Sequence, residues 1–90
     1  MGYKALITLD LSSATEKQRE IFYDFLRKKQ WIKITSLTTA WRASFKDSVQ
    51  RDDAVRILEQ HLSGAKVESK VTKVEYAFQL DTFDIVIKTI

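Results

Sequence analysis

The sequence predicts an α+β domain in which strands and helices alternate along one chain, and three observations predict it. The first apolar run, Tyr3–Leu11, alternates between apolar and more polar residues, as a strand with one buried face does. Two later segments carry apolar residues at spacings of three and four, which is typical of amphipathic helices. Further alternating runs of high β propensity follow each of these helical segments.

Length and composition indicate a single domain, residues 1–90, with 44% hydrophobic and 30% charged residues. No run of about 18 apolar residues is present, so we expect no membrane-spanning helix. The chain has no cysteine, which excludes disulfides and thiolate zinc sites. Because no signal-peptide pattern follows Lys4, we expect a cytoplasmic protein.

The net charge of +3 is unevenly distributed. The first 45 residues carry eight Lys/Arg against four Asp/Glu, whereas the last 45 carry seven against eight. A basic half is compatible with binding to nucleic acid or another polyanion. A surface that is basic only for solubility explains the imbalance about as well.

The first helix is predicted to begin after Ser13 and to run to about Lys29. Ser13 and Glu16 have the spacing of a capping box. A buried stripe follows at helical spacing, formed by Ile21, Phe22, Phe25 and Leu26. The basic triplet 27–29 closes the segment, where positive charge favours the helix dipole; a phosphate contact is the alternative reading of the triplet.

Two strands are predicted next, at Trp31–Ser36 and Thr38–Phe45, and their closeness in sequence favours an antiparallel pair. A second helix is expected from Asp47 or Ser48, with Gly64 at its left-handed C-terminal position. The fourth strand is predicted at Val71–Leu80.

The segment Ile85–Ile90 is predicted to form a short additional strand because its β propensity is high. Asp81 and Asp84 precede it, and this pair of carboxylates is read as a solvated turn in preference to a cation site.

The resulting order is βαββαβ plus a terminal strand. Right-handed crossovers place both helices on one face of a four-stranded antiparallel sheet, which is the ferredoxin-like arrangement. The residues predicted to meet the helices are Ala5, Ile7, Leu9, Ile32, Ile34, Trp41, Phe45, Val74, Tyr76 and Phe78. The residues predicted on the opposite face are Lys4, Thr8, Asp10, Lys33, Thr35, Arg42, Ser44, Lys73, Glu75 and Gln79.

Asp10 is the principal candidate for chemistry, because it is a carboxylate at the end of a hydrophobic strand. It is either a metal ligand or a polar strand end that starts a turn. His61 is read as a residue on the flank of the second helix rather than a catalytic group. Trp31 and Trp41 are predicted to lie in the core or in a dimer interface.

Several families share this element order. RNA-recognition motifs place aromatic residues on the exposed sheet face, and regulatory domains of the ACT type usually have a glycine after the first strand. Here Trp41 and Phe45 are predicted to face the core, and Ser12-Ser13-Ala14 follows the first strand. Both readings are therefore weakened.

A first strand ending in Leu9-Asp10-Leu11, and a strand reading Trp41-Arg42-Ala43-Ser44-Phe45 before the second helix, resemble a group of small nucleases. This group comprises the small CRISPR-associated nuclease of spacer acquisition, the virulence-associated D ribonucleases and the RNase-type antitoxins. The resemblance spans the whole chain in element order. Leu9 stands where the family often has an aromatic residue, and the family's third-strand signature is not clearly present.

The resemblance implies a homodimer that brings two copies of Asp10 together, since a single chain is expected to offer only Asp10 at this place. Two carboxylates could hold one Mg²⁺ for cleavage of RNA or DNA. Lys33, Arg42 and Ser44 are the candidate phosphate contacts, and Ile85–Ile90 would extend the partner's sheet. The alternatives are a non-catalytic nucleic-acid-binding or antitoxin-like module and a protein-assembly domain.

Overall fold

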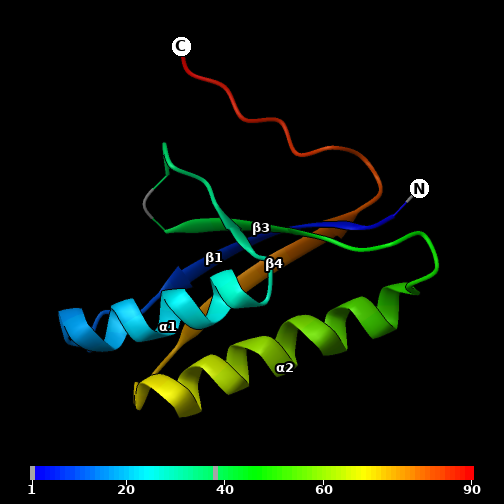
Figure 1. The fold of residues 1–90 in the computed structure, drawn as a ribbon. Coiled ribbons are helices and arrows are strands. Elements are labelled where there is room, and N and C mark those ends of the chain that lie inside the picture. The colour runs from blue at the N-terminus through cyan, green and yellow to red at the C-terminus, as the bar shows by residue number, and fades with distance from the viewer. Residues whose placement is uncertain (1, 38) are drawn as a thin grey trace.

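The computed structural model describes residues 2–37 and 39–90. Its elements follow the predicted βαββαβ order (Figure 1). They are β1 (Lys4–Asp10), α1 (Glu16–Lys28), β2 (Ile32–Lys33), β3 (Ala40–Ser44), α2 (Arg51–Ser69) and β4 (Glu75–Asp81).

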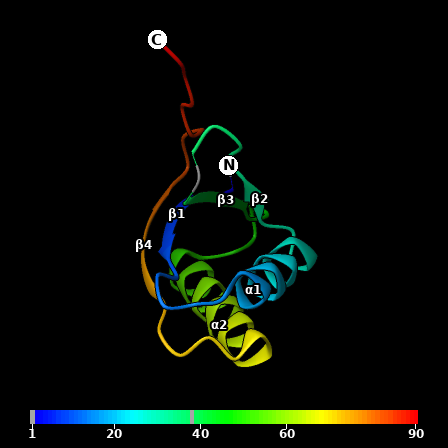
Figure 2. The same ribbon diagram turned by 90° about the vertical axis from the view of Figure 1, so that its left-hand side faces the viewer.

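The four strands form one antiparallel sheet in the order β2-β3-β1-β4. β1 occupies a central position and pairs with β3 on one side and with β4 on the other. Both helices cover the same face of this sheet, and the other face is left without a helix (Figure 2). The predicted ferredoxin-like arrangement is confirmed.

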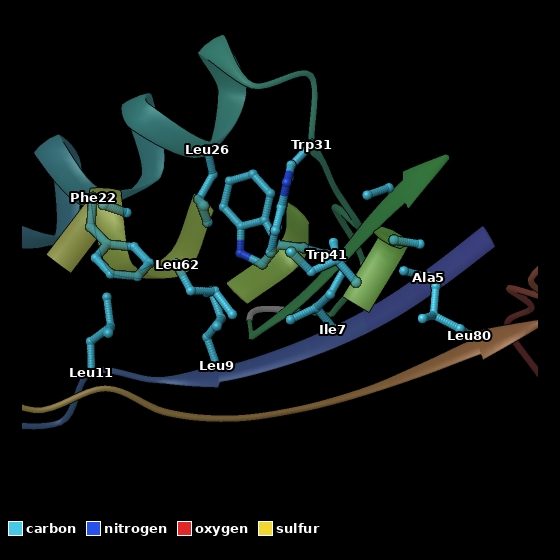
Figure 3. Packing of buried hydrophobic residues seen from close by; sticks show 14 of the residues in the cluster. Ala5, Ile7, Leu9, Leu11, Phe22, Leu26, Trp31, Trp41, Leu62 and Leu80 are labelled. Atoms are coloured by element: carbon cyan, nitrogen blue, oxygen red, sulfur yellow. The ribbon is translucent and has the colours of Figure 1, made fainter. Parts of the chain in front are cut away.

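The hydrophobic core lies between the sheet and the two helices (Figure 3). The alternation predicted for β1 is observed, because Ala5, Ile7 and Leu9 are buried while Thr8 and Asp10 are exposed. Trp41 lies directly opposite Ile7 and is fully buried. Trp31 is also buried, so both tryptophans belong to the core of a single chain.

The N-terminus of α1 has a different cap from the predicted one. Thr15, rather than Ser13, is the N-cap, and its hydroxyl accepts the backbone N–H of Gln18 at 3.1 Å. Gln18 Oε1 in turn accepts the Thr15 backbone N–H at 2.9 Å, which completes a capping box. The prediction of Ser13 with Glu16 was wrong because glutamine satisfies the same geometry two residues later. Residues 11–14 instead form a turn, closed by the bond from Ala14 N–H to Leu11 C=O.

α2 is longer and begins later than predicted. It starts at Arg51, after a turn that joins Val49 N–H to Lys46 C=O, rather than at Asp47 or Ser48. Gly64 was expected to end the helix but lies inside it.

A Cβ at Gly64 would come within 2.6 Å of the Phe25 ring of α1. The glycine therefore permits the close crossing of the two helices. Lys70 takes the left-handed C-cap position, with φ of 62°.

β2 and β3 are shorter than predicted. β2 contains two residues instead of the six in Trp31–Ser36, because the chain turns at once through bonds from Leu37 N–H to Ile34 C=O and from Ala40 N–H to Leu37 C=O. β3 covers Ala40–Ser44 instead of Thr38–Phe45. Thr38, where that prediction began, lies outside the described residues.

β4 begins at Glu75 rather than at Val71. Because α2 continues to Ser69, residues 70–74 are needed to carry the chain from the helix back to the sheet.

Residues 82–90, here called the C-terminal tail, form no strand in the structure of the single chain, so the predicted strand Ile85–Ile90 is not observed. The tail leaves the end of β4 on the side of the sheet away from the helices (Figures 1 and 2). Phe83 and Val86 are 73% and 75% exposed. A segment with high β propensity forms a strand only when it pairs with another strand, and in the described chain the tail pairs with none.

Candidate functional site

The strand register defines the face of the sheet that the helices leave uncovered, here called the open face. Directly opposed residues in an antiparallel pair point to the same side, and neighbours along a strand alternate. The register therefore places twelve residues on the open face: Lys4, Leu6, Thr8, Asp10, Ile32, Ala40, Arg42, Ser44, Glu75, Ala77, Gln79 and Asp81.

Asp10 lies on the open face at the end of β1, as predicted, and is exposed. It is directly opposite Glu75 of β4. The expectation that a single chain offers only one carboxylate here was therefore wrong. Glu75 had been predicted on this face, but its position across from Asp10 depends on the register of β4, which local sequence does not fix.

Two like charges directly opposite each other on a sheet destabilise it unless another group compensates. Lys73 supplies that compensation, with its Nζ 3.0 Å from Glu75 Oε1. The hydrogen bond and charge of Glu75, with a smaller contribution from Asp10, raise the pKa of Lys73. Lys73 therefore stays protonated, and the three groups carry one net negative charge.

A shallow hollow of about 520 Å³ surrounds this carboxylate pair. Thr8 and Thr39 add hydroxyl groups to its lining, beside Asp10 and Glu75. Oxygen ligands of this kind suit Mg²⁺, which is usually held by one or two carboxylates and retains several waters. Within residues 2–37 and 39–90, no three Asp, Glu or His side chains are grouped closely enough to hold a metal ion.

Arg42 and Ser44, two of the predicted phosphate contacts, lie on the open face as expected. Arg42 is opposite Leu6, and Ser44 is opposite Lys4 at the far end of β1 from Asp10. From the rise along a strand, the Cα atoms of Asp10 and Arg42 are roughly 14 Å apart. In one chain, these groups therefore cannot contact the same phosphate as Asp10.

Lys33 does not lie on the open face, and this prediction was wrong. It is opposite Trp41, so it points to the helix side, with its Nζ 5.7 Å from the centre of the Trp41 ring. Ile32, predicted to face the core, is opposite Arg42 on the open face and is half exposed. A shift of one residue in a strand exchanges its two faces, and β2 is too short for its own pattern to decide the register.

The charged residues of the open face do not form a basic surface. Its strands carry the carboxylates of Asp10, Glu75 and Asp81 against the cations of Lys4 and Arg42. Lys4 is in addition 3.4 Å from Asp84 of the tail. Asp81 accepts the backbone N–H groups of Thr82 and Phe83, which supports the reading of this segment as a turn.

The basic triplet at the end of α1 has partners within the chain. Arg27 donates to Asp24 and lies over the Trp41 ring, while Lys29 lies over the ring of Phe25. Arg27 and Lys28 occupy the last turn of the helix, where their charge favours the dipole. These contacts support the interpretation of the triplet as a helix end.

His61 lies on the flank of α2, as predicted, and its Nδ1 accepts the indole N–H of Trp31 at 2.9 Å. Burial, followed by the charge of Lys29, lowers the pKa of His61. The hydrogen bond from Trp31 also favours the neutral form of His61, because a protonated Nδ1 cannot accept the indole N–H. His61 is therefore a neutral partner of a core tryptophan.

Comparisons with known proteins identify the fold. No protein-family model matches the sequence, and no curated protein matches it significantly. Among solved structures, the crystal structure of protein SP2199 from Streptococcus pneumoniae matches with a TM-score of 0.58 and 12% sequence identity. The match covers 94% of this chain and 90% of that one. It is a likeness of fold.

In the described part of the chain, no helix has both the length and the apolar character needed to cross a membrane.

Proposed function

We propose that this protein acts on nucleic acid as a homodimer and cleaves phosphodiester bonds with Mg²⁺ held by Asp10 and Glu75. The observation that carries the proposal is the carboxylate pair on the open face, where Asp10 and Glu75 are direct neighbours across two strands. Neither side chain is buried, so both are accessible to a metal ion and a substrate. The sequence resemblance to small nucleases points to the same aspartate.

Each carboxylate has a distinct part in this proposal. Asp10 makes no ion pair with a described residue, so it would be the first ligand of the metal. Glu75 would exchange Lys73 for the metal, which relieves the repulsion between the two acids in the same way. A bound Mg²⁺ supplies Lewis acidity toward a phosphoryl oxygen and lowers the pKa of a coordinated water.

A dimer is part of the proposal because one chain offers two carboxylates and, apart from the Lys73 that is paired with Glu75, no basic group beside them among the described residues. Two open faces brought together would assemble four carboxylates, and Arg42 of one subunit could contact substrate held at Asp10 of the other. The exposed apolar residues bordering this face favour such an association. They include Ile32 of β2, Leu37 in the loop after β2, and Phe83 and Val86 of the tail.

The test compares single-residue variants in cleavage of RNA and DNA with and without Mg²⁺. Asp10→Asn and Glu75→Gln keep the size of each side chain and remove its charge. Asp81→Asn is the matched control, because Asp81 lies on the same face at the other end of β4. We expect loss of cleavage by on the order of 100-fold in Asp10→Asn, a smaller loss in Glu75→Gln, and none in Asp81→Asn.

Binding is measured separately by titrating salt. Affinity that depends on phosphate contacts falls steeply as salt rises. Equal cleavage by wild type and Asp10→Asn, or no cleavage by either protein, would reject the enzymatic proposal. A salt-dependent affinity without cleavage would instead support the non-catalytic nucleic-acid-binding module.

The exposed tail favours one second candidate, an assembly domain that uses the open face and residues 82–90 for pairing alone. It predicts a dimer whose formation does not depend on Asp10 and a protein without affinity for nucleic acid.

A further inference from the structure

A second site is present at the edge of the sheet, away from Asp10. Because β2 contains only Ile32–Lys33, the outer edge of β3 is uncovered beyond Arg42. A pocket of about 340 Å³ opens at this edge, and residues from both sides of the sheet line it: Arg42 and Ser44 belong to the open face, whereas Lys29 and His61 belong to the helix side. We call it the edge pocket, and Lys29, Arg42, Ser44, Lys46 and His61 are among the residues that line it.

The hydrogen-bonding pattern of the sheet leaves a backbone donor free in this pocket. The Phe45 N–H donates to Tyr3 C=O, so the backbone polar groups of Phe45 point toward β1. Ala40 C=O accepts the Ile34 N–H, so the backbone polar groups of Ala40 point toward β2. By alternation, the N–H and C=O of Ser44 face the β2 side as well. In a regular ladder the Ser44 N–H would donate to Gln30 C=O, and the described residues include no such bond; the Gln30 N–H, which would donate to Ser44 C=O, bonds instead to Arg27 C=O.

The polar side chains around Ser44 are donors, and three of them are cations. Arg42, Lys46 and Lys29 make no ion pair with any described residue, and Lys29 lies over the ring of Phe25. The described residues that line the edge pocket include no Asp or Glu. Neutral His61 keeps its Nε2 proton as a donor, because its Nδ1 accepts from Trp31. Grouped cations without a carboxylate are complementary to an anion.

Apolar side chains complete the pocket, with Phe45, Val49 and Ile57 on its walls. The volume is in the range of small-molecule sites, which combine apolar walls with a few convergent polar groups. A bare inorganic ion would use the donors but not these walls. An extended peptide added to β3 would gain backbone bonds at Ser44 alone, which is little for strand addition.

We propose that the edge pocket binds a phosphate monoester carried on a planar or apolar group, as in a mononucleotide. The phosphate is held by Arg42, Lys46, Lys29 and the Ser44 N–H and hydroxyl, and the organic group lies against Phe45 and Ile57. This proposal does not rest on cleavage at Asp10. Arg42 and Ser44 were already predicted as phosphate contacts. The new elements are that the phosphate is a terminal one and that Lys29 and Lys46 also bind it.

The experiment titrates the full chain with adenosine 5′-monophosphate and follows backbone amide shifts by NMR. We expect saturable binding at ~1 mM or below, with the largest shift at the Ser44 amide. Adenosine, which lacks the phosphate, and inorganic phosphate, which lacks the planar group, are each expected to bind at least about tenfold more weakly.

Variants then assign the site. Arg42→Gln and Lys46→Gln are each expected to weaken binding about tenfold, as loss of a hydrogen bond to a charged group does. Arg51→Gln and Lys66→Gln remove the same charges from exposed positions outside the edge pocket and are expected to leave affinity unchanged. Asp10→Asn is likewise expected to bind as the wild type does, which separates this site from the proposed cleavage centre.

Two sources of the ligand are distinguished by competition. A short oligonucleotide with a 5′-phosphate that displaces the mononucleotide, while its 5′-hydroxyl form does not, identifies the end of a nucleic-acid strand. Displacement by neither oligonucleotide identifies a free nucleotide. The proposal is overturned if the mononucleotide does not bind, or if Arg42→Gln and Lys46→Gln bind it as well as Arg51→Gln and Lys66→Gln.

Discussion

At the scale of single residues, the identity of the neighbours decides what each polar group can do. Asp10 is a potential ligand because Glu75 lies opposite it and the open face exposes both. His61 is not a catalytic base in this structure because Trp31 occupies its Nδ1. The sequence identified Asp10 as the candidate and read His61 as a residue on the helix flank, but the partners of both residues are distant along the chain and are seen only in the structure.

A pH dependence of stability follows from the environment of His61. Its pKa is lowered in the folded state, so below about pH 6.5 the unfolded chain binds the proton more readily. Stability is therefore complete above this pH and falls as the pH decreases below it. His61→Asn places an amide oxygen near the Nδ1 position and cannot titrate.

Thermal unfolding at about pH 7.5 and about pH 5.5 checks this prediction. We expect the midpoint of the wild type to fall more between these conditions than that of His61→Asn. His61 is the only histidine in the chain, so the difference between the two proteins isolates its contribution. Equal decreases would contradict the assignment.

At the scale of the elements, caps and crossings determine where each helix begins and ends. α1 is fixed by the Thr15–Gln18 box, and α2 continues through Gly64 because the Phe25 ring fills the space beside it. Because α2 extends to Ser69, β4 begins only at Glu75, which is the residue directly opposite Asp10. The position at which α2 ends therefore helps to determine which residue of β4 lies opposite Asp10.

The capping assignment is tested by a matched pair of substitutions. Thr15→Ala is expected to lower the free energy of unfolding by about 1 kcal/mol, which is the usual effect of losing an N-cap. Ser13→Ala is expected to stay within about 0.5 kcal/mol of wild type, as ordinary surface changes do. Urea unfolding monitored by circular dichroism measures both values. The reverse order of effects would restore Ser13 as the cap.

At the scale of the whole molecule, the two sides of the sheet differ. One side is covered by α1 and α2, and the other carries the open face with the tail rising beside it (Figure 2). Ile32, Leu37 and the apolar residues of the tail remain exposed in the single chain. This arrangement leaves apolar surface where a second copy would cover it.

Light scattering coupled to gel filtration tests self-association. The wild type is expected to have the mass of a dimer, and deletion of residues 82–90 is expected to yield a monomer. Ile87→Asp should weaken the dimer, whereas Thr89→Asp, which adds the same charge at an exposed polar position of the tail, should have a smaller effect. A monomeric wild type would reject the homodimer, and a dimer unaffected by the deletion would remove the tail from it.

The order of the elements, the buried alternation of β1 and the outward position of Asp10 were determined by the sequence alone. Periodicity within a segment reports which side chains share a face, and it needs no information from elsewhere in the chain. The predicted faces of β4 were also correct, because its alternation is long enough to be read.

Only the tertiary structure decided which residues of different strands lie next to one another. The pairing of Asp10 with Glu75, the position of Lys33 over Trp41 and the uncovered edge at Ser44 all depend on the register between strands. Register depends on where helices end and how the core packs, and a shift of one residue exchanges the faces of a strand. In a strand as short as β2, local periodicity carries too little information to prevent that exchange.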